Sequence, residues 1–259
     1  MRNWILLLSL LMVMPLAQAE TDEQKGLAII TESDNRDKGW HDSSANMLMT
    51  LRNRQGKESI REIRISNLEV DGDGDKGLTV FNKPRDVKGT AFLTYSHSLD
   101  PDEQWLFLPA LKRVKRISSS NKSGPFMGSE FAYEDISSFE IPKYSYLYVR
   151  DEVLDGMDCF VVETRPQYKH SGYTKSHVWI DKKEYQIRKI DFYDRKDTLL
   201  KIQRFTDYQQ YLDQYWRAHT MTMENQQTGK STTLQWSDFT FQNGLTDKDF
   251  EKNDLKRQR

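Results

Sequence analysis

The chain has 259 residues, of which 38 are lysine or arginine and 39 are aspartate or glutamate, so its formal net charge is −1. This balance excludes general nucleic-acid binding, which needs a basic domain or stripe, and leaves only local electrostatic sites. A single cysteine, Cys159, excludes an internal disulfide, and the strand-like residues around it predict a small buried apolar side chain.

Residues 1–19 have the three parts of a secretory signal peptide. Arg2 precedes an apolar run from Trp4 to Leu16, and an Ala-Gln-Ala cleavage motif ends at Ala19. The run is too short to span a bilayer comfortably, and no cysteine near the motif offers a lipid anchor. We expect export to the periplasm, cleavage after Ala19 and one mature domain over residues 20–259.

The mature chain is expected to begin with a helix and to continue with strands. Thr21, followed by two acidic residues, is typical of a helix N-cap, and the apolar residues Leu27, Ala28 and Ile30 predict a helix to about Asp34. Beyond residue 40, apolar and polar residues alternate with period two. That pattern is typical of antiparallel strands joined by tight turns.

The alternation predicts about six strands before residue 120 and seven more after residue 143. The later strands are expected at residues 144–150, 159–166, 175–183, 186–194, 199–208, 215–226 and 232–241. There is no βαβ alternation and no internal repeat. We therefore expect a mainly β fold, a large curved antiparallel sheet or open barrel, with residues 248–259 as a solvated tail.

One acidic segment resembles the start of a calcium-binding loop. Asp71, Asp73 and Asp75 have the spacing of the first ligands, but the sixth and twelfth positions hold Lys76 and Asn82 instead of glycine and glutamate. Aspartate and glycine are also the residues that tight turns select. A turn between two strands is the better interpretation.

The sequence contains no convincing catalytic, cofactor or metal motif. Gly128-Ser129-Glu130 lacks the second glycine of a nucleophile elbow and lies among aromatic residues. The five histidines include no pair at i and i+4 and no HExxH motif. We expect a binding protein that is not an enzyme, with no cofactor.

The stretch from Thr90 to Asp135 is rich in aromatic residues. Trp105 and Phe107 alternate with Leu106 and Leu108, so both faces of this strand are apolar and both need a cover. A glycine-flanked loop then carries a second apolar cluster, which is suited to act as a flap. The alternative is an ordinary core. Residues expected in the wall or flap of a hydrophobic pocket are Phe92, Trp105, Phe107, Phe126, Met127, Phe131 and Tyr133.

Four cations lie between these two aromatic clusters: Lys112, Arg113, Lys115 and Arg116. In the simpler interpretation they form the solvated face of a strand whose other face includes Val114. In the alternative they form a basic rim that docks anionic headgroups or a partner, which their position beside apolar patches favours.

Two motifs in this stretch resemble a known family. QWLFLPALKRVKRI, followed by SGPFMGSEFAYEDI, resembles the signature of periplasmic outer-membrane lipoprotein-sorting proteins, a LolA-like family. The match is specific over residues 105–109 and 126–135 and looser over nearly the whole mature chain. The resemblance implies an incomplete antiparallel β-barrel closed by short helices, an apolar cavity for acyl chains, and partnership with an inner-membrane transporter of the RND class.

Together these observations predict a periplasmic carrier of lipid or lipoprotein acyl chains, active toward the outer membrane and in peripheral contact with membranes. Burial of about 14 methylenes corresponds to about 11 kcal/mol of transfer free energy, so such a chain needs a protein cavity to cross water. The alternative is an adaptor that binds a transporter or envelope protein through the aromatic face.

Overall fold

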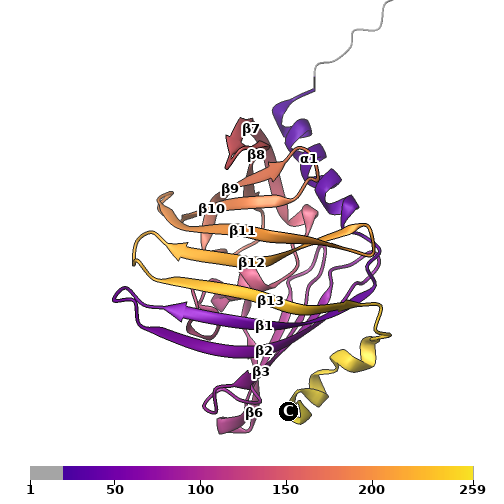
Figure 1. Cartoon of the computed structure of the whole chain (residues 1–259), viewed down its shortest axis with the longest axis vertical. Helices are drawn as coiled ribbons and strands as arrows, with labels where there is room; N and C mark the ends of the chain where they lie inside the picture. The colour runs from indigo at the N-terminus through magenta and orange to yellow at the C-terminus, as the bar shows by residue number, and fades with distance from the viewer. Residues whose placement is uncertain (1–19, 259) are drawn as a thin grey trace, which may run out of the picture.

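The computed structural model describes residues 20–258, and the predicted signal peptide lies outside them. The described residues form one antiparallel sheet of 13 strands and one α-helix, α1 (Asp22–Arg36). Figure 1 shows how these elements are arranged. The strands are β1 (Asp42–Arg52), β2 (Glu58–Leu68), β3 (Lys76–Lys83), β4 (Ala91–Tyr95), β5 (Glu103–Leu108), β6 (Arg113–Ile117), β7 (Tyr144–Leu154), β8 (Met157–Pro166), β9 (Tyr173–Asp181), β10 (Ile187–Asp194), β11 (Leu199–Tyr211), β12 (Tyr215–Asn225) and β13 (Ser231–Phe241).

Short 3-10 helices connect and cover these strands. They are η1 (Pro109–Leu111), η2 (Ser119–Asn121), η3 (Phe126–Gly128), η4 (Tyr133–Ile136), η5 (Ile141–Lys143), η6 (Asp247–Phe250) and η7 (Lys252–Arg257). The prediction of a mainly β fold with an N-terminal helix and short covering helices is confirmed.

The strand order shows an open sheet made of two meanders. It reads β6-β5-β4-β3-β2-β1-β13-β12-β11-β10-β9-β8-β7, so β6 and β7 are the two edges. The pairing of β1 with β13 joins the meanders, and Met49 lies opposite Leu234 in this register. The sheet is curved, and residues 118–143, here called the inner loop, connect the two edge strands across one face (Figure 1).

Helix α1 begins where the sequence predicts. The Thr21 hydroxyl accepts a hydrogen bond from Gln24 N at 3.2 Å, and Gln24 Oε1 accepts one from Thr21 N at 3.0 Å, which completes a capping box. The buried residues of the helix are Gly26, Ile29 and Ile30, whereas the predicted stripe residue Leu27 is exposed. A Cβ atom on Gly26 would lie 2.7 Å from Tyr148 N, so glycine allows close contact with β7.

The outer face of β3 to β6, opposite the inner loop, is covered by the C-terminal segment. Trp105 and Phe107 on β5 pack there with Leu93, and Phe250 and Leu255 complete the cluster, each only 1% exposed. The expectation of a solvated tail is therefore wrong for residues 248–258. The two apolar residues in this charged segment are enough to anchor it as η6 and η7.

Two smaller predictions are confirmed. Cys159 is buried on β8 beside Val161 and Trp179, where it acts as a small apolar side chain. The acidic segment that resembles a calcium loop forms the turn between β2 and β3. In that turn Asp73 accepts a hydrogen bond from Ser98 N at 2.7 Å and contacts His97 Nδ1 at 2.8 Å.

Candidate functional site

A large cavity opens on the inner face, beside the end of α1. It has a volume of about 890 Å³, within the range of sites that bind small molecules. Its lining comes from α1, from both meanders and from the inner loop. The apolar side chains that line it include Ile30, Trp40, Ile136, Phe139, Ile141, Ile187, Phe205, Tyr208, Trp216, Met221, Trp236 and Phe239.

Strand alternation explains much of this apolar wall. On β13, Leu234 belongs to the buried inner core and Trp236, two residues later, lines the cavity. On β12, Met223 is buried in the same core and Met221 lines the cavity. The same faces of β12 and β13 thus line the packed core and then the cavity, where no other segment packs closely against them.

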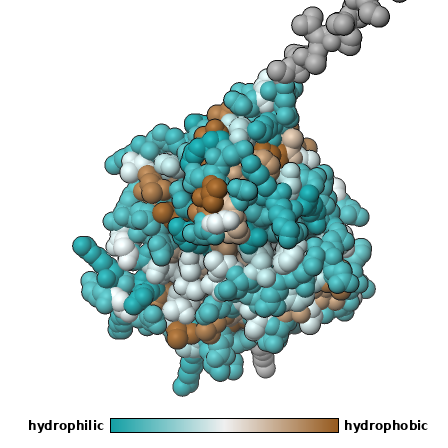
Figure 2. Space-filling model, turned by 45° about the horizontal axis from the view of Figure 1, so that its top comes forward, coloured by the Kyte–Doolittle hydropathy of each residue, from teal (hydrophilic) through white to brown (hydrophobic). Residues whose placement is uncertain are grey.

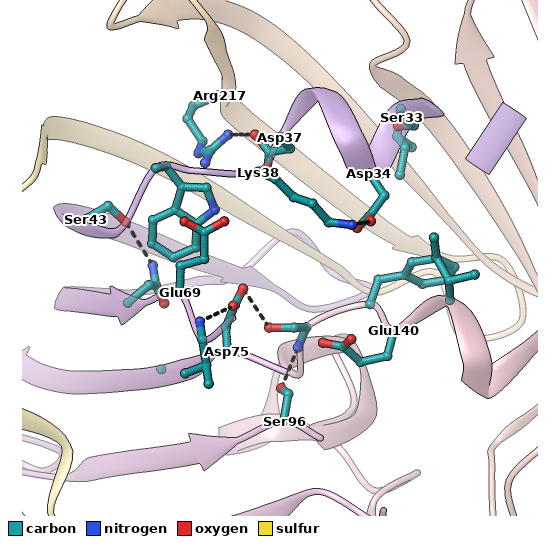
Figure 3. A pocket seen from close by; sticks show the side chains of 18 of the residues that line it. Ser33, Asp34, Asp37, Lys38, Ser43, Glu69, Asp75, Ser96, Glu140 and Arg217 are labelled. Carbon is teal, nitrogen blue, oxygen red and sulfur yellow. Dashed lines mark hydrogen bonds and ion pairs between the residues drawn. The ribbon is translucent and has the colours of Figure 1, made fainter. Parts of the chain in front are cut away.

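A polar region forms the remaining wall, as Figure 3 shows. Asp75 Oδ1 accepts a hydrogen bond from Val70 N at 3.2 Å, and Asp75 Oδ2 accepts one from Ser138 Oγ at 3.4 Å. Ser138 N donates to Ser96 Oγ at 2.9 Å. These bonds hold the inner loop against the β2–β3 turn at the cavity.

Burial shifts the acidity of the carboxyls in this region. It raises the pKa of Asp75 to about 6 and the pKa of Glu140 to about 7, and nearby carboxylates add to both shifts. Burial also raises the pKa of Asp37, although Arg217 opposes that shift through an ion pair and a hydrogen bond. Asp75 and Glu140 therefore change charge near neutral pH.

The inner loop fills the rest of the inner face, next to the cavity. Phe126 packs against Phe92 with ring centroids 5.0 Å apart and meets Tyr133 edge-on at 5.6 Å. Phe126 and Phe131 are 1% and 2% exposed, in one cluster with core residues of β1 to β5. The loop residues that the sequence assigns to a flap are packed into the protein.

Polar contacts fix the inner loop to the sheet. Lys201 Nζ on β11 lies 2.6 Å from Asp135 Oδ2 and 3.0 Å from Glu130 O. Arg61 Nη1 donates to Met127 O at 2.6 Å. Glu134 accepts hydrogen bonds from Tyr168 OH, Ser171 Oγ and Gly172 N at 2.8 to 3.1 Å. The loop is thus bonded to strands of both meanders.

The predicted pocket residues divide between the two faces of the sheet. Phe92, Phe126, Met127, Phe131 and Tyr133 lie together on the inner face. Trp105 and Phe107 lie on the outer face, because successive side chains of β5 alternate and Leu106 takes the inner position. None of these seven predicted residues lines the 890 Å³ cavity.

The sequence pattern does not predict the residues that line the cavity. They come from segments far apart in the chain, and most share the ordinary alternation of core strands. The aromatic residues at the start of β12 and the end of β13, including Trp216, Trp236 and Phe239, are the one local signal. Without the strand register, that signal does not distinguish a cavity wall from a filled core.

The four predicted cations lie at the β6 edge of the sheet. All four side chains are exposed, and Arg116 Nη2 forms an ion pair with Glu103 Oε1 at 2.9 Å. Lys112, Arg113 and Lys115 make no ion pair with any residue in the range 20–258. Val114 packs toward the outer cluster, as the amphipathic-strand interpretation requires.

Residues 20–258 contain no group of three or more His, Cys, Asp or Glu side chains arranged to hold a metal ion. In the same range, no helix has the length and apolar character needed to cross a membrane.

Comparison with known proteins identifies the family. A family model described as "Uncharacterized protein" matches residues 73–257, and no curated protein matches the chain. A Vibrio parahaemolyticus structure, described as an outer membrane lipoprotein-sorting protein domain, is 61% identical, with 91% of this chain and 100% of that chain covered and a TM-score of 0.89. A DUF1329 family protein from Desulfovibrio piger is 31% identical, with 91% and 99% covered and a TM-score of 0.86.

A more distant structure shares the fold. A LolA superfamily protein from Nitrosomonas europaea is 21% identical, with 88% of this chain and 98% of that chain covered and a TM-score of 0.70. The curved, unclosed sheet, the single N-terminal helix and these similarities agree with each other. The chain therefore belongs to the family of the outer membrane lipoprotein-sorting protein domain and the DUF1329 protein, and it has the LolA-like fold.

Proposed function

We propose that the protein is a periplasmic carrier, not an enzyme, that shields an acyl chain of a lipoprotein or lipid during transfer toward the outer membrane. The observation that carries this proposal is the 890 Å³ cavity with its long apolar wall, in a chain that is 61% identical to a lipoprotein-sorting domain. Transfer of an acyl chain of about 14 methylenes from water to an apolar cavity is favourable by about 11 kcal/mol. The cavity would therefore shield such a chain from water during transfer.

The adaptor alternative requires an exposed aromatic surface. Phe126 and Phe131, which would form that surface, belong to the inner loop and are instead buried against the sheet. On the face shown in Figure 2, hydrophobic residues form small, separate patches in a hydrophilic surface. The carrier function is therefore favoured.

Replacing Phe139 by alanine is expected to weaken binding of a fluorescent acyl-chain probe with an uncharged headgroup about tenfold, with little loss of stability. The Phe139 side chain lines the cavity but is 43% exposed, so it contributes more to a bound chain than to the core. Titration of the probe measures the affinity, and thermal unfolding measures the stability.

Leu99→Ala is the matched control, because Leu99 is 81% exposed and lies outside the cavity lining. Native mass spectrometry of freshly purified protein provides a second readout, in which co-purifying lipid is expected. A lipid-free mass together with a bound protein partner would support the adaptor instead.

We further propose that the β6 edge docks the carrier to anionic headgroups or to a partner, of which an inner-membrane RND-type transporter is the candidate. Three of its cations are exposed and make no ion pair within residues 20–258, which supports this role. An edge strand also offers unpaired backbone groups to a partner strand.

Replacing Lys112, Arg113, Lys115 and Arg116 together by glutamine is expected to weaken association with anionic liposomes and to remove its salt dependence. The melting temperature should change little, since exposed charges contribute at most about 1 kcal/mol to folding. Liposome flotation at several salt concentrations, with thermal unfolding in parallel, measures both effects. Unfolding of the variant with unchanged binding per folded molecule would make the cluster structural.

A further inference from the structure

The cavity lining carries an excess of negative charge. Seven carboxylate side chains line it, against three cations: Lys38, Lys76 and Arg217. The carboxylates are Asp34, Asp37, Glu69, Asp71, Asp73, Asp75 and Glu140. An uncharged acyl chain needs none of them, so the excess requires a separate explanation.

The three cations are already engaged. Lys38 Nζ lies 2.6 Å from Asp34 Oδ2, and Arg217 forms an ion pair with Asp37. Lys76 pairs at 2.5 Å with Asp247, which lies outside the cavity lining. The carboxylates that remain without a cation in residues 20–258 include Asp75 and Glu140.

Glu140 and Asp75 lie beside each other at the polar wall. A Cβ atom on Gly74 would be 2.7 Å from Glu140 Oε1, so the Glu140 carboxylate rests against the backbone of the residue before Asp75. Glu140 has no hydrogen-bond partner for its side chain among the described residues. Figure 3 shows both carboxylates in the same part of the cavity wall.

A buried hydroxyl provides an independent sign of a polar ligand. Thr94 on β4 lines the cavity, is only 4% exposed, and its Oγ1 has no hydrogen-bond partner in the protein. A buried polar atom left without a partner is costly, which favours a ligand that supplies one.

We propose that the cavity selects amphiphiles with a cationic, amine-type headgroup, whose charge is met by Glu140 and Asp75 while the chain lies along the apolar wall. This proposal rests on the carrier function above and specifies its cargo class. An ammonium group can donate up to three hydrogen bonds, and the Glu140 and Asp75 carboxylates, which form no ion pair in residues 20–258, can accept them.

The charge of this wall depends on pH. The pKa values of about 7 for Glu140 and about 6 for Asp75 mean that both carboxyls are ionised at pH 8 and mostly protonated at pH 5. Binding of an amine should therefore weaken as the pH falls. The charged groups that face the two carboxyls are Asp34, Asp37, Glu69, Asp102 and Lys143, and Lys143 is already paired with Asp102.

Three ten-carbon probes test the proposal: decylammonium, decanol and decanoate. Isothermal titration calorimetry at pH 8 should show decylammonium binding at least about tenfold more tightly than decanol, and decanoate more weakly than both. The ratio between amine and alcohol should decrease toward one at pH 5. The amine itself keeps its charge over this range, so the change must come from the protein.

Glu140→Gln should reduce the preference for the amine at pH 8, and Asp71→Asn, at an exposed position of the lining, should reduce it less. Asp213→Asn is the control, because Asp213 is exposed and lies outside the cavity lining. If none of the three probes binds, decanol included, the carrier proposal is wrong. If all three probes bind equally, or decanoate binds best, the carrier proposal stands and the headgroup selection is wrong.

Discussion

Replacing Lys201 by methionine is expected to lower the free energy of unfolding by about 3 to 5 kcal/mol, because it leaves the Asp135 carboxylate buried without a cation. The two side chains are 4% and 6% exposed and lie 2.6 Å apart. The same ammonium group also donates to Glu130 O. Its loss therefore removes two bonds between the sheet and the inner loop.

Urea denaturation measures this effect, and two controls isolate its cause. The double variant Lys201→Met with Asp135→Leu should recover much of the loss, because replacing both partners leaves no unpaired charge in the interior. Lys175→Met breaks an ion pair with the more exposed Asp197 and should cost about 1 kcal/mol or less. A loss below that value for Lys201→Met would show that the inner loop is not held by this pair.

Replacing Phe250 by alanine is expected to cost about 3 to 5 kcal/mol of folding free energy, the range observed when large core side chains are truncated. Its ring lies in the outer cluster with Trp105 and Phe107. The backbone is also used, because Tyr95 OH donates to Phe250 O at 2.6 Å. Truncation would loosen the only cover that the described residues give to this part of β5.

Thermal and urea unfolding give the magnitude, and Leu255→Ala should show a loss of about 2 to 5 kcal/mol by the same mechanism. Lys256→Ala is a control within the segment, since this residue is exposed and, unlike Lys252, does not lie over the Trp105 ring. Limited proteolysis should cleave the C-terminal segment of Phe250→Ala much faster than that of the unchanged protein. A Phe250 variant as stable as the original would restore the interpretation of a solvated tail.

The sequence predicts that both faces of β5 are covered, but it does not identify the two covers. Alternation alone places Trp105 and Leu106 on opposite sides. The covering segments, the inner loop and the C-terminal residues, are 3-10 helices and turns without a period of their own. Only the tertiary contacts assign Phe126 to the Leu106 side and Phe250 to the Trp105 side.

The fold itself was more predictable than the site. Period-two alternation and tight turns give the number and approximate position of the strands, because every strand repeats the same local signal. The cavity has no such repetition. Asp75 and Glu140 meet only because the inner loop returns to the β2–β3 turn, and nothing near either residue in the sequence predicts that contact.

The pairing of β1 with β13 has a consequence for the order of folding. Met49 and Leu234 lie at opposite ends of the sequence yet are direct neighbours in the sheet. Until the last strand is available, β1 has an open edge, and unpaired edges invite association with other chains. Such distant pairing slows folding, since a long loop must close before the contact forms. We expect the sheet to be completed only after the whole chain is available, with the β1 edge as the position most in need of protection until then.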